Sequence, residues 1–232
     1  MCKTGHISAS KNWMRYADYL MSGEWHIHTA YTDGENSVDE YCRKAVLIGV
    51  PLLVFSEHVR RTMDYDFYKL LDEIEIARGE YPGLVILPGC EAKVLSDGSL
   101  DVSEDVLDAC EIVLMAFHSF PVDVDTYLAA LEIALVNPRV DIWAHPGLFL
   151  VRNNIVPDKD RIEHILKLAV DNDVLIEINK KYNLPPKEWA DIRMEGVTFV
   201  RGGDVHRVED FIARGSGGGI GMGIYEVPND CQ

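Results

Sequence analysis

The sequence contains no long hydrophobic run and no recognisable targeting segment. No stretch approaches the roughly 18 unbroken apolar residues that a membrane helix needs. The N-terminal residues also lack a basic segment followed by an apolar run, which a secretory signal would require. These absences predict a cytoplasmic protein that does not interact with membranes.

Cysteine and basic residues are both scarce. The five cysteines form no Cys-x-x-Cys pair and show no regular spacing, so neither a disulfide framework nor a thiolate zinc site is indicated. Lysine and arginine number 22 against 38 aspartates and glutamates, which gives a formal net charge of −16. Such a surface repels the phosphates of long nucleic acid, so no stable binding of it is expected.

The domain organisation is predicted to be simple. With 232 residues and 47% hydrophobic content, the chain can build one large core, and it shows no internal repeat or linker. We therefore predict a single domain over 1–232 with its core at about 23–209. The Gly-rich stretch that starts at Gly215 lacks the Lys-Ser/Thr of a phosphate-binding loop, and 215–232 is interpreted as a tail.

The apolar pattern predicts a parallel α/β architecture. Short runs rich in β-branched residues alternate with segments of helical period, as in βα units around a parallel sheet. A capping box of Ser37 and Glu40 begins the first helix, and Gly49 ends it. Other helices are expected over 159–170 and from Pro185-Pro186. The predicted strands are 24–28, 52–56, 85–94, 112–117, 141–144, 174–178 and 198–201.

Six of the eight histidines fall at or just beyond the ends of these strands. In a parallel α/β barrel all such ends lie on one face, so side chains distant in sequence converge there. Carboxylates occupy matching places, and imidazole with carboxylate suits zinc, manganese or iron. A lone His-x-His is more often a polar strand face. Chance alone, however, should not place nine side chains able to bind metal at successive strand ends. The candidate metal ligands are His26, His28, Asp33, His58, Glu91, His118, His145, Asp204 and His206.

These residues carry a resemblance to the polymerase and histidinol phosphatase (PHP) superfamily. The similar motifs are His26-Ile-His28 with Asp33, Ser-Glu-His58, Gly-Cys-Glu91-Ala-Lys, His118-Ser-Phe, Ala-His145-Pro-Gly and Gly-Asp204-Val-His206. They span about 23–209 and fill all of the family's ligand positions. The resemblance implies a distorted seven-stranded (β/α)7 barrel, similar to a TIM barrel, that holds two to three divalent transition metals.

The same resemblance implies which residues would bind each ion. One ion would take His26, His28, Glu91 and Asp204, and Glu91 would bridge to a second ion on His118 and His145. A third ion would take Asp33, His58 and His206, and the aspartate in that set leaves the native metal open. A metal-bound hydroxide would attack phosphorus, so Glu91, Asp204 and His118 are the implied catalytic residues.

Several cations near these motifs are candidates for binding a substrate phosphate. Lys93 lies two residues after Glu91 on the same strand and should face the metals. Arg60, Arg207 and Lys180 follow strand ends at the same rim, where solvated charges are the competing interpretation. Arg61 is interpreted as such a rim charge, and Lys180 with Lys181 could equally be an exposed pair.

The remaining distinctive residues are expected to be structural. His6 and His164 lie away from the strand ends, and Cys90 and Trp25 should alternate outward from their ligand neighbours into the core. The leading hypothesis is a phosphatase for a small phosphomonoester, for example histidinol phosphate. One alternative is a nuclease or phosphodiesterase for nucleotides or short oligonucleotides, although the sequence shows no run of basic or aromatic residues for the groove that such an enzyme needs. The other alternative is a non-catalytic metal-stabilised scaffold.

Overall fold

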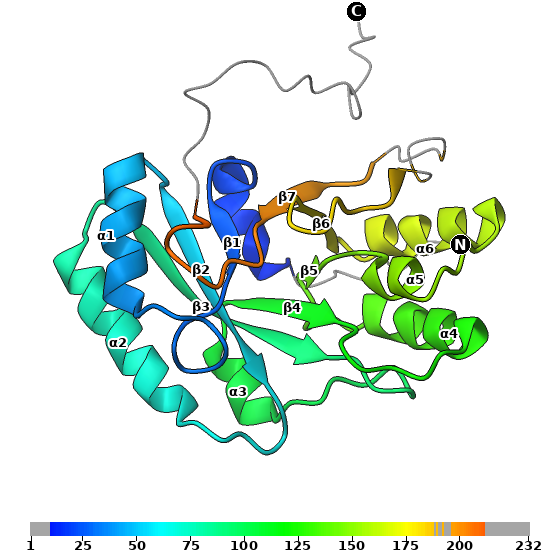
Figure 1. Ribbon diagram of the computed structural model, residues 1–232, viewed down its shortest axis with the longest axis horizontal. Helices are drawn as coiled ribbons and strands as arrows, with labels where there is room; N and C mark the ends of the chain where they lie inside the picture. Colours follow the sequence, from blue (N-terminus) through cyan, green and yellow to red (C-terminus); the bar gives the residue numbers. More distant parts are fainter. Residues whose placement is uncertain (1–9, 188, 190–191, 193–195, 212–232) are drawn as a thin grey trace, which may run out of the picture.

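Seven parallel strands in sequential order form a nearly closed barrel with flanking helices (Figure 1). The computed structural model describes residues 10–187, 189, 192 and 196–211. All seven predicted strands are present, and six of them differ from prediction by at most two residues at either end. Their bounds are β1 Glu24–Ile27, β2 Leu52–Val59, β3 Val85–Lys93, β4 Ile112–Ala116, β5 Ile142–Trp143, β6 Leu175–Asn179 and β7 Phe199–Gly202.

The predicted end of β2 was wrong. The strand continues three residues past Ser56, because each of those residues pairs in register with β3 as far as Val59 and Ala92. His58 therefore lies on a strand opposite Glu91, rather than in the loop that follows. This pairing brings two candidate ligands together through backbone hydrogen bonds.

The barrel is closed between its first and last strands by a short seam. A single bridge joins Ile27 to Val205. The His28 N–H donates to the Val205 carbonyl at 2.8 Å, and the Val205 N–H donates to the His26 carbonyl at 2.9 Å. The seam thus lies immediately beside the His26, His28 and Asp204 side chains.

Helices cover the outside of the sheet. The described α-helices are α1 Val38–Ile48, α2 Phe67–Glu80, α3 Glu104–Ala109, α4 Val124–Leu135, α5 Leu148–Arg152 and α6 Lys159–Asp171. In Figure 1, α1 and α2 lie on one side of the sheet and α4, α5 and α6 on the other. The predicted capping box is present, since the Glu40 N–H donates to Ser37 Oγ and the Ser37 N–H donates to Glu40 Oε2. Gly49 ends α1 in a left-handed conformation, with φ +73°.

The core has two layers separated by the sheet. The larger cluster lies between the strands and the helices and includes Cys90, as predicted for this cysteine. The smaller cluster gathers inward-facing strand residues such as Val54, Leu87 and Leu114. Trp13 joins it from the 3-10 helix η1 (Asn12–Tyr19), an element that the apolar pattern did not predict.

Trp25 does not lie in the outer layer, as strand alternation had predicted. It is fully buried in the inner cluster with Leu52 and Val54, and its Nε1 donates to the Tyr19 carbonyl at 3.1 Å. The cause is an irregularity in β1. Glu24 pairs with Leu53 but Ile27 pairs with Phe55, so β1 has one more residue than β2 between these two pairs. The bulge breaks the alternation on which the prediction relied.

Some predictions fall wholly or partly on residues outside the description. They are His6, the tail over 215–232 and much of the helix expected from Pro185-Pro186. His164 on α6 has a side chain that is 55% exposed and lies 3.5 Å from Glu132, in agreement with a surface role. Among the described helices, none has the length and apolarity needed to cross a membrane. The cytoplasmic location and the single-domain division stay predictions.

Candidate metal centre

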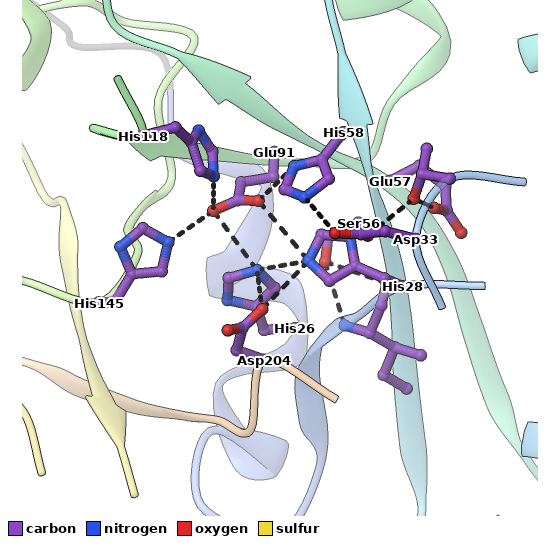
Figure 2. Close-up of polar contacts among 12 residues, drawn as sticks. His26, His28, Asp33, Ser56, Glu57, His58, Glu91, His118, His145 and Asp204 are labelled. Carbon is purple, nitrogen blue, oxygen red and sulfur yellow. Dashed lines mark hydrogen bonds and ion pairs between the residues drawn. The ribbon is translucent and has the colours of Figure 1, made fainter. Parts of the chain in front are cut away.

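The nine candidate ligands converge at the carboxyl ends of the barrel strands, and Figure 2 shows all of them except His206. His26 lies on β1, His58 on β2 and Glu91 on β3. The others follow strands, because a loop that leaves the end of a parallel strand starts on the same face of the barrel. They are His28 and Asp33 after β1, His118 after β4, His145 after β5, and Asp204 and His206 after β7.

Glu91 is the centre of the cluster. Its carboxylate is fully buried and has five imidazoles within 4 Å. His145 Nε2 is 2.7 Å from Oε1, and His118 Nε2 is 3.2 Å from the same oxygen. His58 Nδ1 is 2.8 Å from Oε2, and both His26 and His28 approach to 3.6 Å. One carboxylate on β3 therefore contacts side chains from four other strands, β1, β2, β4 and β5.

Two further carboxylates complete the cluster. Asp204 Oδ1 lies 3.3 Å from His28 Nε2 and 3.7 Å from His26 Nε2. Asp33 Oδ2 lies 3.4 Å from His58 Nε2 and 3.3 Å from His206 Nε2. Each carboxylate thus shares imidazoles with another member, and the nine side chains form one connected group.

Several buried ligand atoms have no hydrogen-bond partner. They include Nδ1 of His28, His58 and His118 and Oε2 of Glu91. His58 Nδ1 and Glu91 Oε2 are 2.8 Å apart, yet they are not aligned as a hydrogen bond. Unpaired buried polar atoms are costly, and converging unpaired lone pairs are what a bound cation would satisfy. Three sets of donor atoms are close enough to share an ion, namely His26-His28-Asp204, His28-His58-His206 and His58-Glu91-His118.

Two carboxylates and one imidazole of the cluster have charge states suited to a cation. Burial alone would raise the pKa of Glu91, but the neighbouring His26 and His118 hold that pKa well below its ordinary value. Burial opposes ionisation of Asp204 as well, whereas His28 and His26 lower its pKa. Burial lowers the pKa of His28 to about 4, so this imidazole is neutral at pH 7 and keeps a lone pair for a metal. The set is therefore two buried carboxylates beside a neutral imidazole.

Glu177 on β6 is a buried carboxylate that the sequence analysis missed. Its Oε1 lies 2.6 Å from His26 Nδ1, and its Oε2 accepts from the His145 backbone N–H and, at 3.2 Å, from Asn179 Nδ2. A carboxylate on the outer ring nitrogen fixes the tautomer of a metal-binding histidine, so that the other nitrogen faces the ion. The signal in the sequence was an acidic residue within the apolar strand Leu-Ile-Glu-Ile-Asn.

The packing around Glu177 leaves no room for a side chain opposite it. A Cβ on Gly202 of β7 would stand 1.9 Å from Glu177 Oε1. His145 has φ +31°, an uncommon conformation for a residue with a side chain, and its N–H bond to Glu177 helps to hold it there. Glu177 therefore contacts candidate ligands from two different strands at once.

The candidate substrate-binding cations lie at the rim, mostly beside other polar groups. Lys93 Nζ donates to Ser119 Oγ at 2.7 Å, next to His118. Arg207 pairs with Glu35 at 2.9 Å, and Arg60 lies 3.9 Å from Asp101. Lys180 is exposed and makes no polar contact with the described ligands. Its neighbour Lys181 does so instead, since Nζ donates to Asp204 Oδ2 at 2.8 Å.

The chain matches one known protein family and several known proteins. The family described as PHP domain matches residues 24–181. The DNA polymerase/3'-5' exonuclease PolX of Bacillus subtilis (strain 168) is 29% identical over 199 residues, which cover 82% of this chain and 35% of that protein. A probable phosphatase of Shewanella pealeana is 28% identical over 195 residues, or 78% of this chain and 76% of the relative.

A solved structure has a similar fold. It is histidinol phosphate phosphatase from Lactococcus lactis, crystallised with zinc, L-histidinol and phosphate. The match has a TM-score of 0.61 at 16% identity and covers 80% of this chain and 86% of the other. The chain thus spans about a third of the polymerase but most of the phosphatases.

Proposed function

Because this chain belongs to the PHP domain family, we propose that it is a metal-dependent phosphoesterase that hydrolyses a small phosphomonoester. The observation that carries the proposal is the buried carboxylate of Glu91, which has five imidazoles within 4 Å. Glu91 Oε2 and Nδ1 of three of these imidazoles lack a hydrogen bond. The probable phosphatases among its relatives support the reaction class. A scaffold without catalysis would have no need to retain this complete set.

The residues present fit two to three divalent transition metals, such as zinc, manganese or iron. The unpaired nitrogens and the Glu91 oxygen are the donors such ions prefer, and the connected group of nine side chains supports the proposal. Bound there, the ions would supply acidified water near neutral pH and would neutralise charge on the phosphoryl oxygens. The number and identity of the ions are part of the proposal.

The side chains of this chain have distinct parts in that reaction. Glu91 and Asp204 stay ionised and hold the imidazoles in place, while Glu177 orients His26 through Nδ1. His118 has a side chain that is 27% exposed, so it contacts Glu91 and is also accessible to a substrate. We assign Glu91, Asp204 and His118 as the catalytic residues, with Lys93 as a cation for the substrate phosphate.

The proposed substrate is small because of charge. With a net charge of −16, the surface repels a long polyanion, whereas a small ester needs only the pocket itself. The phosphate complex of the histidinol phosphatase is consistent with such a substrate. The exonuclease name of PolX supports the alternative, but the similarity covers only a third of that protein.

The test is a substrate panel on metal-loaded protein. Purified protein is loaded with manganese, zinc or iron and assayed with histidinol phosphate, nucleoside monophosphates, a chromogenic ester and a single-stranded oligonucleotide. We expect the highest kcat/KM on a small monoester at both low and moderate salt. Efficient cleavage of the oligonucleotide with no turnover of any monoester would replace the phosphatase with a nuclease.

Metal content is measured on the same samples. Fewer than one equivalent of metal after loading with each ion in turn would contradict the metal centre itself. A fully loaded protein without activity on any ester would instead support the scaffold.

A further inference from the structure

A group of two cations and one aromatic ring stands beside the metal centre and has no part in the reaction described so far. Arg152 is the last residue of α5, and Lys181 and Tyr182 follow β6. The Tyr182 ring lies 6.3 Å from the His145 ring, nearly perpendicular to it. Arg152 Cζ is 5.5 Å and Lys181 Nζ is 5.3 Å from the centre of the Tyr182 ring.

The loop that carries Tyr182 is held in a defined conformation. Asn179 and Leu184 exchange two backbone hydrogen bonds, which close the turn over residues 179–184. The buried Asn179 side chain accepts from the Tyr182 N–H at 3.1 Å and donates to Glu177 Oε2 at 3.2 Å. The same carboxylate that orients His26 thus anchors this loop, so its position relative to the ligands is fixed.

The two cations differ in how far they are neutralised. Lys181 donates to Asp204 and approaches His206 Nδ1 at 3.3 Å, so it is joined to the metal centre. Arg152 is exposed, and no carboxylate among the described residues lies within ion-pair distance of it. Arg60 and Arg207 at the same rim each have a carboxylate neighbour. In an acidic protein, an arginine held over an aromatic ring beside the site is available to a ligand anion.

We propose that Arg152, Tyr182 and Lys181 form a second anion subsite, which selects phosphomonoesters whose leaving group carries a carboxylate or another phosphate. The inference rests on the proposed function for its substrate. Hydrolysis breaks the ester P–O bond, gives inorganic phosphate, and leaves the second anion on the released alcohol. Lys181 forms the end of the subsite that contacts Asp204, and Arg152 marks the outer end, where the second anion binds.

The kinetic test compares matched esters with manganese-loaded protein. The carboxylate arm uses 3-phosphoglycerate against glycerol 3-phosphate, and the phosphate arm uses adenosine 3′,5′-bisphosphate against adenosine 3′-monophosphate. We expect kcat/KM to be about tenfold or more higher for the doubly anionic member of at least one pair, the size of one charged hydrogen bond. The arm that shows the preference identifies the second anion.

Substitution then assigns the preference to Arg152. Arg152→Gln should remove it, mainly through a higher KM for the doubly anionic ester, and Arg152→Lys should restore part of it. The control is Arg139→Gln, because Arg139 lies before β5 at the opposite end of the barrel, paired with Asp108. It should leave the preference as in the wild type.

A binding measurement keeps this inference separate from the proposed function. Calorimetry compares 3-phosphonopropionate with propylphosphonate, neither of which can be hydrolysed. Tighter binding of the first that Arg152→Gln abolishes supports the subsite, even if no ester is turned over. An equal affinity for both compounds, or a preference that survives Arg152→Gln, overturns it.

Discussion

Glu91 contacts five histidines that belong to four different strands or strand ends, which makes it the residue on which the candidate centre depends most. It is fully buried, and its neighbours hold it ionised. Loss of its charge would leave several imidazoles facing a neutral amide in a buried site. The consequence should appear in metal content and turnover together.

We predict that Glu91→Gln lowers kcat on a small ester by more than about 100-fold. Loss of a residue that merely supports a metal ligand already costs roughly 10- to 100-fold, and Glu91 is itself a candidate ligand. Elemental analysis and steady-state kinetics on the same preparation measure the effect. A folded variant with a full metal complement and most of its activity would show that the central carboxylate is dispensable.

Glu177 should control metal affinity although it is not a candidate ligand. One carboxylate oxygen of Glu177 accepts from His26 and the other accepts from the His145 backbone N–H. Glu177→Gln would therefore place its NH2 group against one of these two N–H donors. Gly202→Ala should have a similar effect, since its Cβ would displace Oε1. We expect zinc affinity, measured by competition with a chelating dye, to fall about 10- to 100-fold in each variant.

Gly79→Ala is the matched control for the glycine substitution. Gly79 lies within α2, and a Cβ there meets nothing within 4 Å. Zinc affinity should be as in the wild type. If Gly202→Ala also binds zinc with wild-type affinity, the close packing of Gly202 against Glu177 does not affect metal binding by the candidate ligands.

At the residue scale, the sequence indicated which side chains converge but not the groups that support them. His118 and Asp204 could be found because loops after parallel strands start on one face, whatever the details of the barrel. Glu177 contacts His26 across 151 positions in the chain, and its role depends on which strand ends become neighbours. Lys181 reaches Asp204, whereas Lys180, predicted as a cation for the substrate phosphate, is exposed, because a tight turn decides which of two adjacent lysines faces inward.

Helix α1 offers a test at the scale of an element, because its N-terminus has the complete capping box. Ser37 Oγ accepts from the Glu40 N–H, whereas Ser103 begins α3 without any side-chain cap. Ser37→Ala should lower the free energy of unfolding by about 1 kcal/mol, and Ser103→Ala should lower it much less. Chemical denaturation of both variants measures the difference. Equal losses would mean that the cap contributes little to stability.

The elements themselves were largely predictable, and their irregularities were not. Hydrophobic period and turn residues indicate the seven strands, because each strand of a parallel sheet is a short apolar run. The bulge in β1 is set by pairing with β2, which is not visible within β1 alone, and so Trp25 was assigned to the wrong layer. The extension of β2 to Val59 likewise depends on its partner β3.

For the whole molecule, a buried carboxylate away from the candidate metals gives a pH dependence. Burial raises the pKa of Asp141 to about 6, although the Val113 N–H and Lys11 oppose the shift. An acid whose pKa is raised by folding favours the folded state at low pH. Its contribution is complete below the unfolded pKa of about 4 and is lost as the pH rises through about 6.

Asp141→Asn should therefore become more stable relative to the wild type as the pH rises from 4 to 7, by roughly 2–3 kcal/mol. Urea unfolding of metal-stripped protein at several pH values measures this, so that loss of ions does not contribute. Asp108→Asn is the control, because the Asp108 side chain is 69% exposed. A stability difference from wild type that stays constant across this range for Asp141→Asn would contradict the prediction.

The seam around Val205 also affects how the barrel opens. Two backbone hydrogen bonds join His26 and His28 to Val205 there. Candidate ligands lie on both sides of the seam. His26 and His28 are on one side, and Asp204 and His206 are on the other. Ions shared across the seam should oppose its local opening. Amide hydrogen exchange at His28 and Val205 should accelerate when a chelator removes the metals, while exchange at Cys90 in the middle of β3 changes little. Equal protection with and without metal would show that the barrel closes by its backbone alone.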